Sequence, residues 1–371
     1  MKHFGKYILY VIFAFNLFFA GMLMLTAYSP YIHPTLHPIA SCLGLTFPVF
    51  LLINVLFLLF WVFAGRYKYM WIPILALLIC FPQVRTYVPI NFHTERLPKN
   101  CFKLLSYNIM AFDGDTKDKN GENPILNYLR NSAADILCLQ EYRVSASDKY
   151  LTQGDVENAL SAYPYFDIQN IGTERSGYSN RIACYSKYPI VSARKLHLKS
   201  GYNGSVVYEI VLDGDTVTLI NNHLESNKLT KQDKVVYEDM LASPKTETVK
   251  SGARLLIHKL AEASAIRAVQ ADSVARVVAT STHPHIVVCG DFNDTPISYT
   301  HRVIGERLND AFAQSGNGLG ISFNQNKFYF RIDHILADKN FKAYNCTVDR
   351  SIDVSDHYPV WCYLKKIEKK Q

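Results

Sequence analysis

Polar side chains that can bind a cation or move a proton lie at the ends of apolar runs at six separate places in the chain. These residues are Asn108 after "LLSY", Glu141 after "ILCLQ", His223 after "TLINN", Asp291 and Asn293 in "VVCGDFN", Asp333 in "FRIDH", and Asp356 with His357 in "SDHYPV". No local rule of secondary structure accounts for the same chemistry at six strand ends so far apart in sequence. We therefore expect these ends to meet at one site.

The residue types select the chemistry of that site. Carboxylate and amide oxygens without a cysteine–histidine cluster favour a hard cation, Mg²⁺ first, with Mn²⁺ or Ca²⁺ as alternatives. Mg²⁺ commonly meets substrate phosphates through one or two carboxylates. Two histidines beside carboxylates supply donors for a phosphate and partners for proton transfer. The set as a whole indicates metal-assisted hydrolysis of a phosphate ester.

Each of these residues also has a plainer structural interpretation. Asn108 can be a turn former and Glu141 can simply be exposed to solvent. A lone histidine such as His223 is often a satisfied structural group. Asp291 is harder to explain in this way, because it follows an apolar run and a glycine, and Asn293 is its same-face neighbour at the strand period of two. The joint occurrence favours the chemical interpretation.

Strands mixed with helices must position these side chains. Apolar runs typical of buried strands recur from Phe102 to Leu364, and helical patterns separate several of them, most clearly at Ala253–Thr280. An Asp-Gly pair within "SVVYEIVLDGDTVTLINNHL" predicts a hairpin turn. This mixture predicts an α/β fold built as a layered sandwich. The charged, irregular segment 227–251 indicates an inserted helix or loop without an assigned role.

The N-terminal part of the chain has the character of a membrane region. No charged residue lies between Lys6 and Arg66, and two apolar runs, Tyr7–Tyr28 and Pro38–Gly65, each exceed the ~20 residues needed to cross a bilayer. A third run, Tyr69–Val84, is shorter and contains two prolines, so it is a marginal span. A cleaved signal peptide is an alternative for the first run.

The distribution of basic residues predicts which side of the membrane holds the rest of the chain. Lys2 and Lys6 precede the first run, and Arg66 with Lys68 follows the second, so the positive-inside rule makes that side cytoplasmic. If the third run also spans, everything after it is exported. We therefore expect a multi-pass membrane protein whose catalytic domain lies on the periplasmic or extracellular side.

Four sections of the chain follow from these patterns. We expect a membrane region with two to three transmembrane helices at 1–88, a tether at 89–101, a catalytic domain at 102–366, and a basic tail at 367–371.

The charge of the chain gives little support for nucleic-acid binding. The formal net charge is +7, but the first 100 residues hold seven of the 39 basic residues and one of the 32 acidic ones. The remainder therefore holds 32 basic and 31 acidic residues, a balance of +1. Phosphate contacts dominate affinity for duplex DNA, so a domain with this balance is not a strong duplex binder.

The motifs, taken in order, resemble those of the endonuclease/exonuclease/phosphatase superfamily. The segments are "SYNI", "LQE", "YSKYPI", "NNHLES", "GDFND", "RIDHIL" and "SDHYPV", and they extend over about 102–364. The chain thus resembles a membrane-anchored, bacterial-type member of the deoxyribonuclease I-like group. The resemblance implies a four-layer α/β sandwich, with two central mixed β-sheets flanked by helices and with N-terminal transmembrane helices before it. It also implies that the site lies at one rim of the sheets.

For the cation, the resemblance implies three protein ligands or neighbours. Glu141 matches the main metal ligand, Asn108 lies close to the metal and the phosphate, and Asp356 matches a second carboxylate on the metal side.

For the reaction, the resemblance implies five further roles. Asp291 matches the acid that orients or deprotonates the attacking water, with Asn293 binding the phosphate beside it. His223 matches a histidine that contacts the scissile phosphate or the leaving group. His357 matches the second histidine, and Asp333 matches its orienting carboxylate. The division of base and ligand roles between Asp291 and His357 stays open.

The expected protein is a membrane-anchored, Mg²⁺-dependent phosphoesterase. Its substrate would be a phospholipid head group, a nucleic acid or a small phosphodiester, and its oligomeric state is open. A nuclease acting on DNA or RNA is the alternative, and a catalytically inactive binding module is a third hypothesis.

Met110 stands where abasic-site endonucleases carry an acid, which tells against a DNA-repair enzyme. Arg181 is either a substrate-phosphate contact or an exposed side chain.

Overall fold

The computed structural model describes most of the chain. The described residues are 2–114, 116–117, 121–147, 149–172, 180–227, 232–233, 235, 246–325 and 328–367. Most of the expected insert at 227–251 and all but the first residue of the expected basic tail at 367–371 lie outside these ranges.

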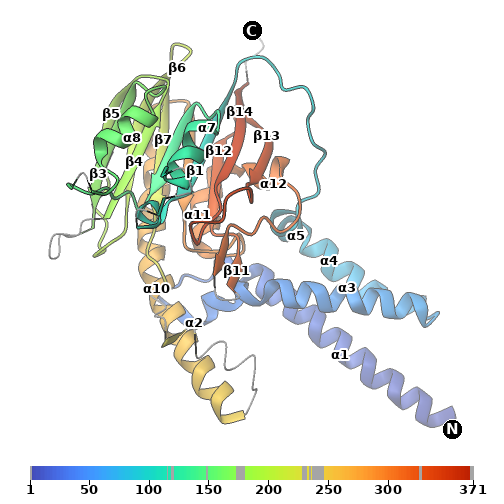
Figure 1. Ribbon diagram of the computed structural model, residues 1–371. Helices are drawn as coiled ribbons and strands as arrows, with labels where there is room; N and C mark the ends of the chain where they lie inside the picture. Colours follow the sequence, from blue (N-terminus) through green and yellow to red (C-terminus); the bar gives the residue numbers. More distant parts are fainter. Residues whose placement is uncertain are drawn as a thin grey trace.

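Two mixed six-stranded sheets form the centre of the protein (Figure 1). In the first sheet, the order is β13-β14-β1-β2-β4-β3, and only β1 and β2 pair in parallel. Its strands are β1 (Cys101–Asn108), β2 (Ile136–Gln140), β3 (Tyr165–Ile171), β4 (Asn180–Ser186), β13 (Phe341–Val348) and β14 (Val360–Lys366).

The second sheet has the order β5-β6-β7-β8-β12-β9, and β7 and β8 are its parallel pair. Its strands are β5 (Ile190–Lys195), β6 (Gly204–Leu212), β7 (Asp215–His223), β8 (His285–Asp291), β9 (Leu308–Asp310) and β12 (Asp333–Asp338). A separate hairpin consists of β10 (Phe323–Gln325) and β11 (Phe328–Phe330).

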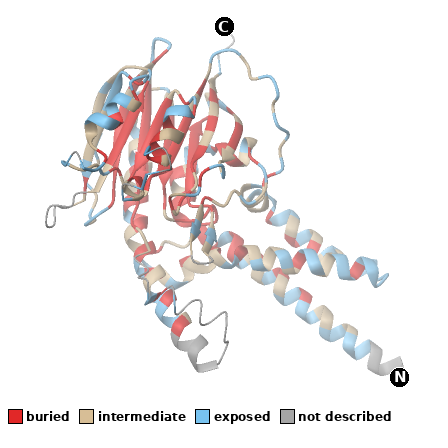
Figure 2. Ribbon diagram, in the orientation of Figure 1, coloured by how far each residue is buried: buried red, intermediate tan, exposed pale blue. Residues whose placement is uncertain are grey.

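Three apolar cores separate four layers, and the central strands are largely buried, whereas the edge strands β3 and β5 are mostly intermediate or exposed (Figure 2). Side chains from both sheets, such as Leu104 and Leu219, fill the space between the sheets. Leu137 on the outer face of the first sheet packs with α7 (Pro124–Asn131) and α8 (Gln153–Ala159). The expected four-layer sandwich is therefore confirmed.

Helices cover the outer face of the second sheet as well. Val288 of β8 packs with Val274 of α10 (Thr246–Thr280) and Ile304 of α11 (Tyr299–Ile304). The helix expected at 253–280 is thus confirmed and begins earlier. The Asp-Gly hairpin is also confirmed, because Asp213 and Gly214 connect β6 to β7 with positive φ angles of 51° and 81°. The remaining short helical segments of this part are α6 (Met110–Asp113), η4 (Gly305–Arg307) and α12 (Ala311–Ser315).

Residues 2–87 consist mainly of helices, the longest of which extend away from the sandwich (Figure 1). They are α1 (Lys2–Tyr28), η1 (Ser29–Tyr31), α2 (Pro38–Ser41), η2 (Cys42–Thr46), α3 (Phe47–Phe63), η3 (Tyr67–Tyr69), α4 (Trp71–Ile79) and α5 (Phe81–Tyr87).

Two helical segments are long and apolar enough to cross a membrane, Lys6–Tyr31 and Pro38–Phe63, with mean hydropathies of 2.3 and 2.5. A third span results if Tyr67–Ile79 and Phe81–Tyr87, bent by 67°, act as one. Many of their apolar side chains are exposed (Figure 2).

The N-terminal helices pack directly against the sandwich. Ile297 of the α/β part is buried among Leu23, Phe47 and Cys80 of the helices. Gly44 permits this approach, because a Cβ atom at residue 44 would lie 1.9 Å from the carbonyl oxygen of Ile297.

Hydrogen bonds add to this contact. The Arg302 guanidinium donates to the carbonyl oxygen of Pro30 (2.8 Å), and the Arg331 guanidinium donates to that of Thr86. Within the expected tether, the side chain of Asn317 bonds the backbone of Asn91. The segment between the helices and β1 is therefore held against the sandwich.

Candidate active site

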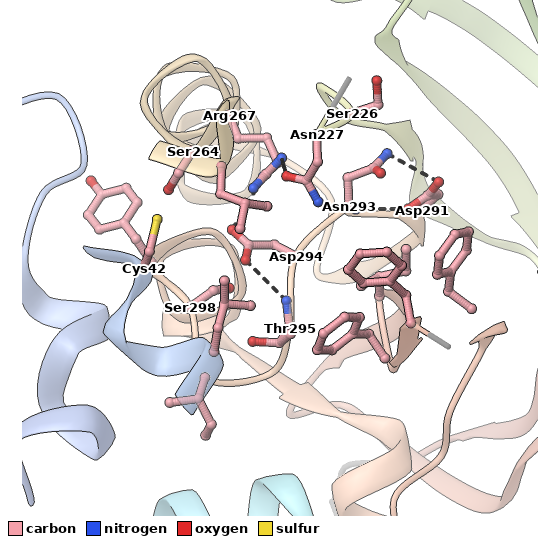
Figure 3. A pocket seen from close by; sticks show the side chains of 18 of the residues that line it. Cys42, Ser226, Asn227, Ser264, Arg267, Asp291, Asn293, Asp294, Thr295 and Ser298 are labelled. Atoms are coloured by element: carbon pink, nitrogen blue, oxygen red, sulfur yellow. Dashed lines mark hydrogen bonds and ion pairs between the residues drawn. The ribbon is translucent and has the colours of Figure 1, made fainter. Parts of the chain in front are cut away.

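All six polar strand ends lie around one cavity. Parallel pairing places the carboxyl ends of β1 and β2 side by side, and the same holds for β7 and β8 in the other sheet. The cavity has a volume of about 260 Å³ (Figure 3). The expected site residues that line it are Glu141, His223, Asp291, Asn293, Asp356 and His357. Asn108 and Asp333 lie directly behind them, in contact with Asp291 or His357.

Asp291 is the central carboxylate. It is 1% exposed, and its Oδ1 accepts a hydrogen bond from the backbone N–H of Asn293 (2.8 Å). Its Oδ2 accepts from the side-chain amides of Asn293 and Asn108, each at 3.2 Å. Burial raises the pKa of Asp291 to about 6, even though the imidazole of His357 lowers it. A carboxyl group with this pKa can accept a proton near neutral pH.

His357 forms a buried pair with Asp333. The imidazole Nδ1 lies 2.8 Å from Asp333 Oδ2, and Nε2 lies 3.7 Å from Asp291 Oδ2. Burial lowers the pKa of His357, but the two carboxylates outweigh burial and raise it well above its usual range. A positively charged imidazole between two carboxylates can bind a phosphate or supply a proton.

His223, at the end of β7, also faces Asp291 and in addition lies near Glu141 of the other sheet. Its Nε2 lies 3.6 Å from Glu141 Oε1 and 3.7 Å from Asp291 Oδ2. On the other side of the ring, the amide nitrogen of Asn180 lies 3.4 Å from Nδ1. If Asn180 donates this hydrogen bond, the proton of neutral His223 lies on Nε2, which faces the cavity.

Glu141 fits the role of a cation ligand. Its side chain is 36% exposed and lines the cavity, and near its Oε1 lie the amide nitrogen of Asn108 (3.3 Å) and His223 Nε2. Asp356 lines the same cavity, and carboxylate oxygens that a cation can reach suit Mg²⁺, Mn²⁺ or Ca²⁺. Asn108 presents its amide nitrogen to Glu141 and Asp291, whereas its oxygen accepts from the Met110 N–H (3.2 Å). In this arrangement Asn108 is a hydrogen-bond donor to both carboxylates.

A second grouping of possible ligands consists of Asp291, Asp333 and His357. A cation there would have to displace the short Asp333–His357 hydrogen bond and would meet an imidazole held in its charged form. The structure thus offers two possible sets of cation ligands at the cavity, this grouping and the carboxylates of Glu141 and Asp356 that line it.

The backbone is strained where three of these strands end. Glu141, Asn293 and Met110 have positive φ angles of 53°, 52° and 44°, which side-chain-bearing residues rarely adopt. Met110 begins α6, which is a left-handed turn. Gly290 has φ of 123°, and a Cβ atom there would lie 2.1 Å from the carbonyl oxygen of Asn222. Such strain commonly marks functional sites, because the surrounding structure has to enforce it.

Two polar residues next to the predicted ones face elsewhere. Asn222 is buried, and its amide donates to the carbonyl oxygen of Cys289 and accepts from the Ser205 hydroxyl. His334 Nε2 contacts the carbonyl oxygen of Asp294 on the face away from the cavity. Both residues alternate with site residues along their strands, so the strand period of two separates them from the site.

His334 belongs to a second cluster of possible ligands, with His301 and Asp310. Asp310 already caps α12 through two backbone N–H groups and contacts His301 Nε2 at 3.0 Å. This cluster therefore has a structural explanation.

Sequence reasoning missed several supporting contacts. Gln140 and Asn221 join the two sheets by a buried hydrogen bond of 2.6 Å directly behind the site. The Ser355 hydroxyl donates to the carbonyl oxygen of Asn108 (2.7 Å). These residues are polar neighbours of the motifs, and only their partners in space reveal their role. Arg181, left open above, donates to the cross-strand Asn170 at 3.0 Å.

Two protein-family profiles match parts of this chain. Residues 105–357 match the profile of the endonuclease/exonuclease/phosphatase family, and residues 8–87 match that of a domain of unknown function (DUF8431). No curated protein matches the chain significantly.

Many solved structures are similar to this chain. An endonuclease/exonuclease/phosphatase from Beutenbergia cavernae is 17% identical, with 72% of each chain covered and a TM-score of 0.50. The human Nocturnin catalytic domain with bound sulfate is 16% identical, with 73% of this chain and 95% of that chain covered and a TM-score of 0.48. A family member from Bacteroides vulgatus is 14% identical, with 72% and 100% covered and a TM-score of 0.45.

The family profile covers most of the chain and includes every strand end that faces the cavity. This chain is therefore a member of the endonuclease/exonuclease/phosphatase family, whose enzymes hydrolyse phosphate-ester bonds.

Proposed function

We propose that the protein is a membrane-anchored phosphoesterase that uses a divalent cation, Mg²⁺ first, to hydrolyse a phosphate ester by attack of an activated water. The observation that carries this proposal is the convergence of carboxylates, amides and imidazoles from both sheets on one cavity. Glu141 and Asp356 would hold the cation, which supplies charge stabilisation for the phosphate when bound.

The residues of the chain would divide the proton transfers. The water oxygen bonds to phosphorus as the ester P–O bond breaks, and the water proton passes to Asp291, whose pKa of about 6 suits a general base. The leaving oxygen takes a proton from His223 or His357. Asn293 and Asn108 would bind phosphate oxygens through their amides, and Asp333 would hold the His357 ring.

Membrane anchoring is supported by the two apolar helical segments and the bent third one. The sandwich contacts the connection 29–46 and the C-terminal end of α5, whereas Lys6, Arg66 and Lys68 lie toward the opposite ends of the helices. With the basic ends in the cytoplasm, the sandwich would lie on the periplasmic or extracellular side.

A nuclease is the second candidate, because the family includes nucleases. The lining of the cavity argues against a nuclease, because Arg267 is the one lysine or arginine among the described lining residues. Its guanidinium already contacts Asp294 (3.3 Å), the carbonyl oxygen of Glu225 (2.7 Å) and Asn227 Oδ1 (2.9 Å). Tracking a nucleic-acid backbone needs further cationic groups.

The test is an assay of the full chain in dodecyl maltoside on bis-p-nitrophenyl phosphate and p-nitrophenyl phosphate. We expect turnover with Mg²⁺ and none with a chelator. His223→Ala should lower the rate by at least ~10²-fold, and the matched variant His283→Ala, remote from the cavity, should leave it unchanged. A folded, metal-supplemented protein without turnover on either ester would overturn the proposal and favour the inactive binding module.

A further inference from the structure

The cavity that holds the catalytic groups is closed on its far side by the N-terminal helices. Besides the strand ends, its lining includes Ser41, Cys42 and Leu45. Figure 3 shows Cys42, on the N-terminal segment, across the cavity from Asp291 and Asn293. One wall therefore comes from the sheets and the opposite wall from the segment that begins the apolar run Pro38–Phe63.

This opposite wall is fixed in position. The Ser41 hydroxyl lies 3.4 Å from that of Ser264 on α10, and α2 packs against α10. Gly44 lies directly on the backbone of Ile297, which itself lines the cavity. The contact is close-packed and involves buried side chains, so it belongs to the architecture of the cavity.

The residues of this wall lie close to one end of the apolar run. Residues 41–45 lie near the start of a 26-residue segment with a mean hydropathy of 2.5, and the segment is 17% buried. In a membrane, the first turns of such a segment lie near the interface between head groups and acyl chains. The cavity thus reaches from the catalytic residues to the depth of the lipid head groups.

The third wall is aromatic. Phe323, Phe328 and Phe330 of the β10–β11 hairpin line the cavity, and the ring of Phe323 lies 5.1 Å from that of His357. Leu45, Ile297 and Ile332 add further apolar side chains to the lining of the cavity. A substrate with its phosphate beside His357 would therefore place its next atoms against apolar side chains.

On the basis of the phosphoesterase proposed above, we propose that its substrate is a phosphate ester of a membrane lipid. The phosphate lies among Asp291, His223 and His357, and the first methylene groups of the lipid lie against Leu45, Phe328 and Ile297. The rest of the apolar chain stays in the bilayer beside the helices. The apolar walls favour this substrate over a nucleic acid. So does Arg267, which is the one lysine or arginine among the described lining residues and is already hydrogen-bonded.

Two soluble esters that differ only in chain length test the proposal. The probes are p-nitrophenyl methyl phosphate and p-nitrophenyl butyl phosphate, with the p-nitrophenyl ester of thymidine 5′-phosphate as a nucleotide probe, all with the full chain in dodecyl maltoside. Each methylene group transferred from water to an apolar wall can raise kcat/KM by up to about fourfold. We expect the butyl ester to exceed both the methyl ester and the nucleotide ester by at least ~10-fold.

Substitutions of residues outside the catalytic groups test whether the apolar walls cause the preference for the butyl ester. Leu45→Ser and Phe328→Ser should remove most of the preference for the butyl ester, measured as the ratio of kcat/KM for the butyl ester to kcat/KM for the methyl ester. Leu36→Ser, in a residue that is 74% exposed and does not line the cavity, should retain the preference.

The outcomes separate the two proposals. Equal cleavage of the methyl and butyl esters, or better cleavage of the nucleotide ester, would overturn the lipid substrate and leave the phosphoesterase standing. The same holds if the butyl preference survives in both wall variants. Failure to cleave any phosphate ester, including the two used to test the enzyme, would overturn the phosphoesterase itself.

Discussion

Asp333 holds the imidazole of His357 by a buried contact of 2.8 Å between its Oδ2 and the ring Nδ1. The pair also aligns the two sheets, because Asp333 lies on β12 of the second sheet and His357 directly precedes β14 of the first. The ring is thereby turned so that Nε2 faces Asp291. An imidazole fixed by a carboxylate keeps one orientation during proton transfer.

The first prediction concerns this pair. Asp333→Asn keeps the shape of the side chain but removes the charge that raises the pKa of His357. The pKa of His357 should fall, and kcat on bis-p-nitrophenyl phosphate should drop by ~10²–10⁴-fold. A pH–rate profile should show the histidine limb at lower pH. Asp353→Asn, in an exposed residue four positions before His357, is the control. An unchanged profile for Asp333→Asn would contradict the proposed orientation of His357.

The second prediction concerns the cation. Glu141→Gln removes the charge of the proposed ligand, so binding of Mn²⁺ measured by calorimetry should weaken, and turnover at low Mg²⁺ should fall by at least ~10²-fold. Partial recovery at high Mg²⁺ would agree with a lost ligand. The exposed Glu157→Gln should behave like the parent protein. Near-normal turnover at low Mg²⁺ would show that Glu141 is not the main ligand.

The third prediction concerns stability and pH. The pKa of Asp291 is raised in the folded protein, so its ionisation opposes folding, and that cost is present above pH ~6 and fades as the pH falls toward 4. In the presence of a chelator, Asp291→Asn should therefore raise Tm at pH 8, and the gain should shrink below pH 6. Hydrolysis should be abolished at every pH. A lower Tm at pH 8, or an active variant, would identify Asp291 as a structural residue.

The fourth prediction concerns its neighbour. Phe292 is fully buried beneath the second sheet and lies 5.0 Å from the ring of His334, on the face opposite the cavity. Phe292→Ala should cost about 3–5 kcal/mol of stability, measured by thermal unfolding. The rate per folded molecule should stay within about threefold of the parent rate. Phe92→Ala, in a residue that is 97% exposed, is the control. Lost catalysis in folded Phe292→Ala would place this ring in the site.

The fifth prediction concerns topology. A reporter that is active only outside the cytoplasm, fused after Gln371, should be active if α4 and α5 together complete a third span. A second fusion after Tyr67 should be inactive, because that residue lies beside the basic end of α3. Activity of a cytoplasm-only reporter at the C-terminus would contradict the three-span arrangement.

Much of the fold, and the convergence of polar residues on one site, could be predicted from the sequence because strands have a regular side-chain period. The strand period of two and the parallel pairs bring polar residues from the ends of β1, β2, β7 and β8 to one edge, so Asp291 and Glu141 could be selected without coordinates. The same period separates His334 from Asp333, although both lie in one motif.

Long-range contacts could not be predicted in this way. Gln140 meets Asn221 across the two sheets, and Asn180 reaches the Nδ1 of His223, with no local pattern to indicate either contact. The contribution of Cys42 and Leu45 to the cavity wall could likewise not be predicted from the sequence. An apolar run signals membrane crossing from its own composition, but composition does not indicate which surface of a following domain it will contact.

The close approach of Gly44 to Ile297 has a mechanical consequence. Transmembrane helices change their tilt when the hydrocarbon thickness around them changes. Even one added methyl group does not fit between Gly44 and the Ile297 backbone. In the proposed membrane arrangement, we therefore expect a change in the tilt of the helices to move the residues that follow Ile297. These include Ser298 and Tyr299 on the cavity wall. For the membrane-anchored enzyme proposed above, we therefore expect the width of the cavity, and with it the catalytic rate, to depend on the acyl-chain length of the surrounding lipids.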